Sequence, residues 1–141
     1  MSKLWIQFFG GQTDRINQGA AVVVFKQLKT QGAAVATTSF ATETLSPGLY
    51  RVSYYARITR AATTSSSLTV TIGHTDGAVS ITQVGAAITG NTTATVQSGT
   101  ALMRVDTATA VTYGTAYSST GSTSMQYRLD LAFEFLVGEL G

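Results

Sequence analysis

The sequence predicts an all-β sandwich or barrel of about eight to ten antiparallel strands. Thr, Ala, Ser, Gly and Val dominate the 141 residues, and the Thr and Val content favours strands. Runs in which apolar and polar residues alternate recur at short, regular spacing, separated by turn signals. Apolar residues at helical spacing are hard to find, so helices are not expected to build the core.

The length and the charge of the chain limit its domain organisation and its partners. A sequence of 141 residues fits a single domain, which we place at residues 20–141, after an arm and linker of residues 1–19. Charged residues make up 11% of the chain and the net charge is +2, so no nucleic-acid partner is expected. A surface with so few charges is unusual for a free monomer, and it indicates that part of the surface faces other subunits. The absence of cysteine excludes disulfides and cysteine-ligated metals.

The N-terminal arm is the most apolar segment of the sequence. Its apolar residues are Leu4, Trp5, Ile6, Phe8 and Phe9. The run is too short for a signal peptide or a membrane span, so we expect synthesis in the cytoplasm and no membrane partner. Gly10-Gly11 ends the run and lacks the lysine and helix of a phosphate loop. Two readings of the arm stay open: it is the first strand of the domain, or it adds as a strand to a neighbouring protein.

Alternation and turn residues place the strands. In chain order we expect them at residues 20–28, 33–43, 50–59, 67–75, 79–88, 94–105, 110–118 and 126–135. The first two are expected to form a hairpin, and Asp76-Gly77 is a typical hairpin turn. Gly99, inside its strand, favours a β-bulge there. The last strand has one strongly apolar face and one polar face, which is typical of a central strand.

Two strands have clearly different faces. In a strand, residues two apart share a face. The expected inward row of the strand after Pro47-Gly48 is Tyr50, Val52, Tyr54, Ala56 and Ile58. The expected outward row is Arg51, Ser53, Tyr55, Arg57 and Thr59. In the last strand the expected inward row is Tyr127, Leu129, Leu131, Phe133 and Phe135.

Three segments resemble the tumour necrosis factor and complement globular-head family. SPGLYRVSYYARIT (Ser46–Thr59) is similar to a family strand in which a glycine precedes aromatics at alternate positions. VQSGTALMRVDTATAVTYGTAY (Val96–Tyr117) resembles a later pair of its strands, and MQYRLDLAFEFL (Met125–Leu136) lies where its last core strand lies. The resemblance implies a jelly roll that assembles as a compact trimer. We therefore expect a jelly-roll β-sandwich with an N-terminal extended arm.

Candidate chemistry is sparse, and no enzyme activity, cofactor or metal site is expected. His74 is the one histidine, and neither a second histidine nor a cysteine exists to complete a metal site with it and Asp76. Asp130 and Glu134 share a face of one strand but lie about 13 Å apart along it, too far for a carboxylate pair. Ser98-Gly99 lies within a strand and not on a nucleophile elbow.

The resemblance extends to jelly rolls of bacteriophage virions, and it leads to the functional expectation. We expect a virion structural protein on the capsid exterior, a homotrimeric decoration protein that stabilises the head at junctions of the major capsid protein. The arm is expected to contact the capsid. The expected subunit interface consists of Arg51, Tyr55, Arg57 and Arg128, since Tyr and Arg are enriched at interfaces, although a plain solvated exterior is an equal alternative. The alternative function is a trimeric receptor- or glycan-binding tip or tail accessory module.

Overall fold

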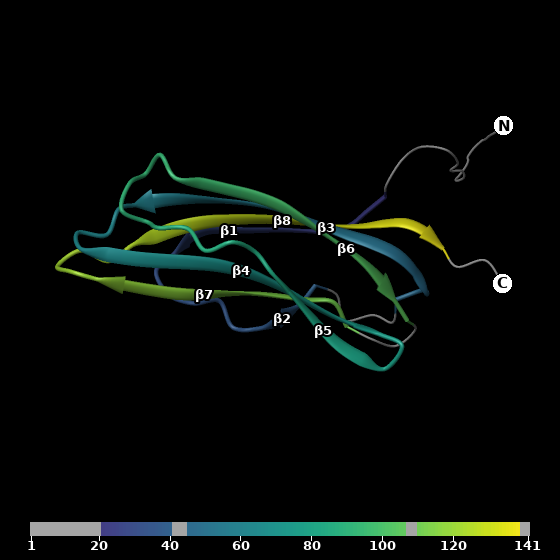
Figure 1. Ribbon diagram of the computed structural model, residues 1–141. Helices are drawn as coiled ribbons and strands as arrows, with labels where there is room; N and C mark the ends of the chain where they lie inside the picture. Colours follow the sequence, from purple (N-terminus) through teal and green to yellow (C-terminus); the bar gives the residue numbers. More distant parts are fainter. Residues whose placement is uncertain (1–20, 41–44, 107–109, 139–141) are drawn as a thin grey trace, which may run out of the picture.

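The computed structural model is a sandwich of two four-stranded antiparallel sheets, and it describes residues 21–40, 45–106 and 110–138 (Figure 1). Sheet A has the strand order β1-β8-β3-β6, and sheet B has the order β2-β7-β4-β5. The strands are β1 (Ala21–Gln31), β2 (Thr38–Ser39), β3 (Gly48–Arg60), β4 (Ser65–Asp76), β5 (Val79–Val84), β6 (Val96–Val105), β7 (Thr112–Thr120) and β8 (Gln126–Gly138). In the described ranges, no helix is long and apolar enough to cross a membrane.

The strand pairing is that of a jelly roll. Strand β1 pairs with β8, β2 with β7, β3 with β6 and β4 with β5, so each strand meets its counterpart counted from the other end. The pairs β3–β8 and β4–β7 then join these ribbons into the two sheets. A chain paired end to end in this way, and rolled so that its halves face each other, is the eight-stranded jelly roll. The predicted fold class is therefore confirmed.

Apolar side chains from both sheets fill the space between them. Val52, Ala56 and Ile58 of β3 are completely buried, and Tyr50 is almost so, which confirms the predicted inward row. The inward residues of β8 are completely buried from Tyr127 to Phe133, and Phe135 is half-buried. Strand β8 lies between β1 and β3, so its prediction as a central strand is correct. At one end of the core, aromatic rings pack with centroids 4.7–5.3 Å apart.

A chain of hydrogen bonds joins the two sheets through the core. The Val35 amide donates to Thr115 Oγ1 of β7 at 2.8 Å, and the Thr115 and Tyr127 hydroxyls lie 2.7 Å apart. Tyr127 Oη of β8 donates its proton to the Ala33 carbonyl at 2.8 Å, so the Thr115 hydroxyl donates to Tyr127. Burial raises the pKa of the Tyr127 phenol, and the bond from Thr115 partly opposes this. Each polar atom in this series of hydrogen bonds therefore has a partner, as buried groups require.

The predicted hairpin between the first two strands is wrong. Strands β1 and β2 lie in different sheets, because jelly-roll pairing matches each with a strand near the other end of the chain. Within the expected strand 33–43, only Thr38–Ser39 is strand, and residues 41–44 lie outside the described ranges. The expected strand 79–88 ends at Val84, and Ile88 forms an isolated bridge to Leu68.

The two glycine signals have different outcomes. The turn after Asp76 is the predicted hairpin, with positive φ at both Gly77 (58°) and Ala78 (68°), as a type I′ turn requires. The bulge at Gly99 is wrong, because the register between β3 and β6 is continuous there. Gly99 is instead small because the Tyr54 hydroxyl lies over it, 2.6 Å from where a Cβ would stand. The predicted arm residues, Leu4 to Phe9, lie outside the described residues.

Candidate functional site

The outer faces of the two sheets differ sharply in charge. In the described ranges, all seven Lys and Arg residues belong to strands of sheet A: Lys26, Lys29, Arg51, Arg57, Arg60, Arg104 and Arg128. The strands of sheet B contain neither Lys nor Arg, and Asp76 at the end of β4 is their one acidic residue. Cations that are scattered along the sequence are therefore gathered in the strands of one sheet, and Lys29, Arg51, Arg57 and Arg128 lie on its outward face. Lys26 instead shares a face of β1 with Val24 and Leu28, which pack on the core.

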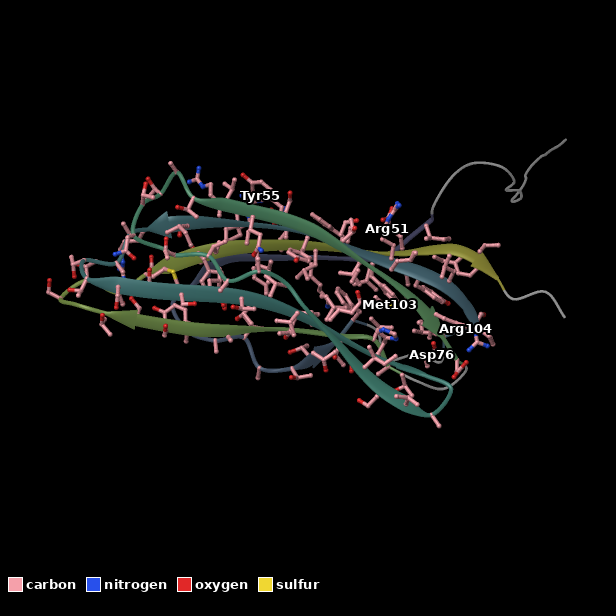
Figure 2. The ribbon with its side chains drawn as sticks, viewed as in Figure 1. Arg51, Tyr55, Asp76, Met103 and Arg104 are labelled. Carbon is pink, nitrogen blue, oxygen red and sulfur yellow. The ribbon has the colours of Figure 1, made fainter. Side chains whose placement is uncertain are left out.

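The register of sheet A sets its outward side chains in cross-strand rows. Arg57 of β3 lies directly opposite Arg128 of β8, and Tyr55 lies opposite Asp130. Farther along, Arg51 lies opposite Glu134. Figure 2 shows Arg51 and Tyr55 on the side of β3 that faces away from sheet B, whereas Met103 points toward it. Like charges directly opposite each other destabilise a sheet, so the Arg57–Arg128 pair calls for an explanation.

A basic hollow of about 460 Å³ lies over this pair. It is lined by Lys29, Tyr55, Arg57, Thr59, Arg128 and Asp130. Arg128 Nε donates to Asp130 Oδ2 at 3.0 Å, which uses the one carboxylate of the lining. Arg57 has no hydrogen-bond or ion-pair partner among the described residues, and its side chain is exposed. Three cations and one carboxylate (+3 − 1 = +2) leave the basic hollow with two uncompensated positive charges.

An apolar hollow of about 230 Å³ adjoins the basic one. Its lining includes Phe25 of β1, Tyr55 of β3 and, between them on β8, the small residue Ala132. Phe25 is 58% exposed and Tyr55 is 43% exposed, which is unusual for large aromatic side chains. Tyr55 and Asp130 line both hollows, so the two are continuous. We call the two hollows together the trough.

An ion pair lies on the same face beyond the trough. Arg51 Nε donates to Glu134 Oε1 at 3.0 Å, and Ser53 Oγ lies 3.5 Å from the same oxygen. The hydrogen bond and the negative charge of Glu134 raise the pKa of the Arg51 guanidinium. Both side chains reach solvent, so the pair contributes little to stability. It holds Arg51 along the sheet, beside Glu134.

The structure brings the four predicted interface residues together on one face. Arg51 and Arg128 have acidic partners within the chain, whereas Tyr55 and Arg57 present their ends to the trough. Whether they contact another subunit stays a prediction. Sequence reasoning missed Phe25 and Lys29, because their neighbours on β8 follow from long-range pairing. The sequence did contain a local signal for them. Phe25 and Lys29 directly follow Val24 and Leu28, which pack on the core, so strand alternation places both on the outer face.

His74 is remote from the trough and packs in the core. It is 6% exposed, and its Nε2 lies 3.3 Å from the Gln83 side-chain amide nitrogen. The same Gln83 amide donates to the Leu102 carbonyl of β6 at 3.0 Å, so the histidine helps to fix the side where β5 and β6 meet. In the described ranges, no group of three His, Cys, Asp or Glu side chains is placed to hold a metal ion.

Comparisons with known proteins do not indicate a function, so the functional proposal rests on the geometry of the trough. No family model matches the sequence, and no curated protein matches it. The structure is similar to a solved structure titled "Family 16 Carbohydrate Binding Module-2", with 11% sequence identity and a TM-score of 0.41. The match covers 76% of this chain and 73% of that chain. A likeness of this strength carries no argument about function.

Proposed function

We propose that this protein is a non-catalytic recognition module that binds a saccharide in the trough on sheet A. The observation that carries the proposal is the exposed Tyr55 ring, which stands between an apolar hollow and a hollow with uncompensated cations. Sugar rings present C–H faces that pack on aromatic rings and hydroxyl groups that bond to polar side chains. A hollow of about 460 Å³ lies in the size range of small-ligand sites.

The lining supports binding without catalysis. Glycoside hydrolysis uses two carboxyl groups about 5–9.5 Å apart, one of them free to transfer a proton. The basic hollow contains a single carboxylate, Asp130, and that group is bonded to Arg128. Its other polar groups are cations, a phenol and a threonine hydroxyl, and His74 lies elsewhere in the core.

A second candidate function is the virion decoration trimer, with the major capsid protein as partner. It is favoured by the apolar edge of sheet A, where β6 exposes Val96 (49%) and Leu102 (56%) and pairs on one side with β3. An edge strand of this kind is a site at which another chain adds. In this function the outward residues Arg51, Tyr55, Arg57 and Arg128 contact a neighbouring subunit, and the N-terminal arm contacts the capsid.

Two variants separate the candidates. We expect Tyr55→Ala to weaken binding on a glycan array and in titration calorimetry by about tenfold or more, because the ring loses its contact with the sugar. We expect Leu102→Asp, the control at the β6 edge, to leave that binding unchanged. Native mass spectrometry of both variants reports assembly. If the wild-type protein binds no saccharide and forms a trimer that Tyr55→Ala dissociates, this face is a subunit interface and the saccharide proposal is wrong.

A further inference from the structure

We propose that the saccharide bound in the trough is a sugar acid, whose carboxylate is held by Arg57 with Lys29 and Arg128 while its ring packs on Tyr55. This inference rests on the proposed function and names its ligand class. It follows from the charge, spacing and unsatisfied groups of the basic hollow.

First, the charge balance of the basic hollow favours an anionic ligand. Arg57 and Arg128 face each other across the β3–β8 pair, where facing Cα atoms lie about 4.5–5.5 Å apart. Lys29 of β1 adds a third cation to the same hollow. Asp130 compensates Arg128, but Arg57 and Lys29 have no partner among the described residues. An anion placed between these side chains relieves a repulsion that the protein alone leaves in place.

The second step is the shape of the anion. A guanidinium group presents a planar fork of N–H donors that matches a carboxylate with two parallel hydrogen bonds. Asp130 also lines the basic hollow, but it is already bonded to Arg128, so the Arg57 fork is the group left to bind an anion. A planar carboxylate is therefore the anion whose shape matches this guanidinium best.

The third step is the spacing between the anion and the ring. Tyr55 and Arg57 are two residues apart on the same face of β3, so they lie about 7 Å apart along the strand. That distance is comparable with the length of one monosaccharide, so one sugar acid reaches both side chains. On the other side of Tyr55, the apolar hollow with Phe25 and Ala132 offers room for a neighbouring neutral residue.

The fourth step is an unsatisfied hydroxyl at the same place. Thr59 lines the basic hollow, and its Oγ1 is buried without a hydrogen-bond partner within the described chain. Buried polar atoms almost always have a partner, so this hydroxyl calls for an explanation, and a missing bound molecule is one. In the proposal, a sugar hydroxyl next to the carboxylate supplies that partner.

The test compares matched acidic and neutral saccharides by titration calorimetry on the full-length protein. The probes are sialyllactose against lactose, and oligogalacturonate against its methyl ester. We expect the acidic member of at least one pair to bind about tenfold tighter or more, since a charged hydrogen bond is lost with the carboxylate. We expect this preference to shrink as salt rises from 0.05 to about 0.5 M.

The variants assign the preference to named residues. Arg57→Gln should reduce the acidic-over-neutral ratio to near one, because the carboxylate loses its unpaired guanidinium partner. Arg104→Gln removes the same charge at the far end of β6, next to Asp76, and should leave the ratio as in the wild type (Figure 2). Thermal midpoints that are not lower than that of the wild type confirm that both variants are folded.

The outcomes separate the inference from the proposed function. If neutral saccharides bind as tightly as acidic ones, or if sulfated sugars bind and carboxylated ones do not, the sugar-acid inference is wrong and the saccharide module stands. If no saccharide of either kind binds, both are wrong. A preference for acids that Arg57→Gln leaves intact also overturns the inference.

Discussion

The two sheets are alike on the inside and unlike on the outside. Both contribute rows of completely or almost completely buried apolar residues, Leu129 and Leu131 from sheet A and Val70 and Ile72 from sheet B. On the outside, sheet B is neutral and rich in hydroxyl groups. Its outward residues on β4 and β7 include Ser67, Thr69, Thr71, Thr75, Thr112, Ala116, Ser118 and Thr120. The strands of sheet A instead contain every Lys and Arg of the described ranges, and the outer face of this sheet carries Arg51, Arg57 and Arg128 with the exposed aromatic rings of the trough.

This difference shows that the fold alone does not account for the charged and aromatic residues on the outer face of sheet A. A jelly roll needs alternation and filled inner faces, and sheet B satisfies both with small neutral residues outside. The opposed arginines, Arg57 and Arg128, cost stability rather than adding to it. Residues that oppose stability mark functional sites in many proteins.

The largest effect should come from the inner faces, and it should be similar for both sheets. We expect Leu131→Ala in sheet A and Ile72→Ala in sheet B each to lower the free energy of unfolding by about 2–5 kcal/mol, because each leaves a cavity in a closely packed core. Urea denaturation measures both. A loss under 1 kcal/mol for one variant alone would show that its sheet is not an equal part of the core.

Alternation made the inner faces predictable from sequence, because the residues that share one face of a strand are set only by their spacing along the chain. The inward rows from Tyr50 and from Tyr127 were both predicted correctly. Neighbours across the sheet were not predictable. Arg57 and Arg128 are 71 residues apart in the chain, and only the β3–β8 register sets them opposite each other. The hairpin expected between β1 and β2 failed for the same reason, since jelly-roll pairing is long-range.

The next effect concerns the hydrogen bonds that join the sheets. We expect Tyr127→Phe to cost about 1–3 kcal/mol of unfolding free energy, because the Ala33 carbonyl and the Thr115 hydroxyl lose a buried partner. Denaturation of the variant measures it. Tyr50→Phe is the control: it removes a phenol whose partner among the described residues is the carbonyl of exposed Ser46, and it should cost less. Equal losses of unfolding free energy would mean that the hydrogen bonds between the sheets stabilise the protein no more than the one near the surface.

The raised pKa of Tyr127 predicts the direction in which stability changes with pH. Burial raises the pKa of Tyr127 above the ordinary value near 10, so the folded state holds this proton more tightly than the unfolded state. The stability it contributes is complete below about pH 10 and is lost as pH rises through the folded-state pKa. We therefore expect the wild type and Tyr127→Phe to converge in stability above about pH 10. A gap that widens over pH 10–11 would contradict this sign.

The smallest effect tests the outer faces directly. We expect Arg57→Thr to raise the free energy of unfolding by roughly 0.2–1 kcal/mol at low salt, because the repulsion from Arg128 is removed, and we expect the gain to shrink in high salt. The matched change on sheet B, Thr69→Arg, introduces the charge on a neutral face and should stay within about 0.5 kcal/mol of the wild type. Chemical denaturation at two salt concentrations measures both. If Arg57→Thr instead destabilises the protein, Arg57 is a structural residue, and the argument that sheet A keeps it for binding fails.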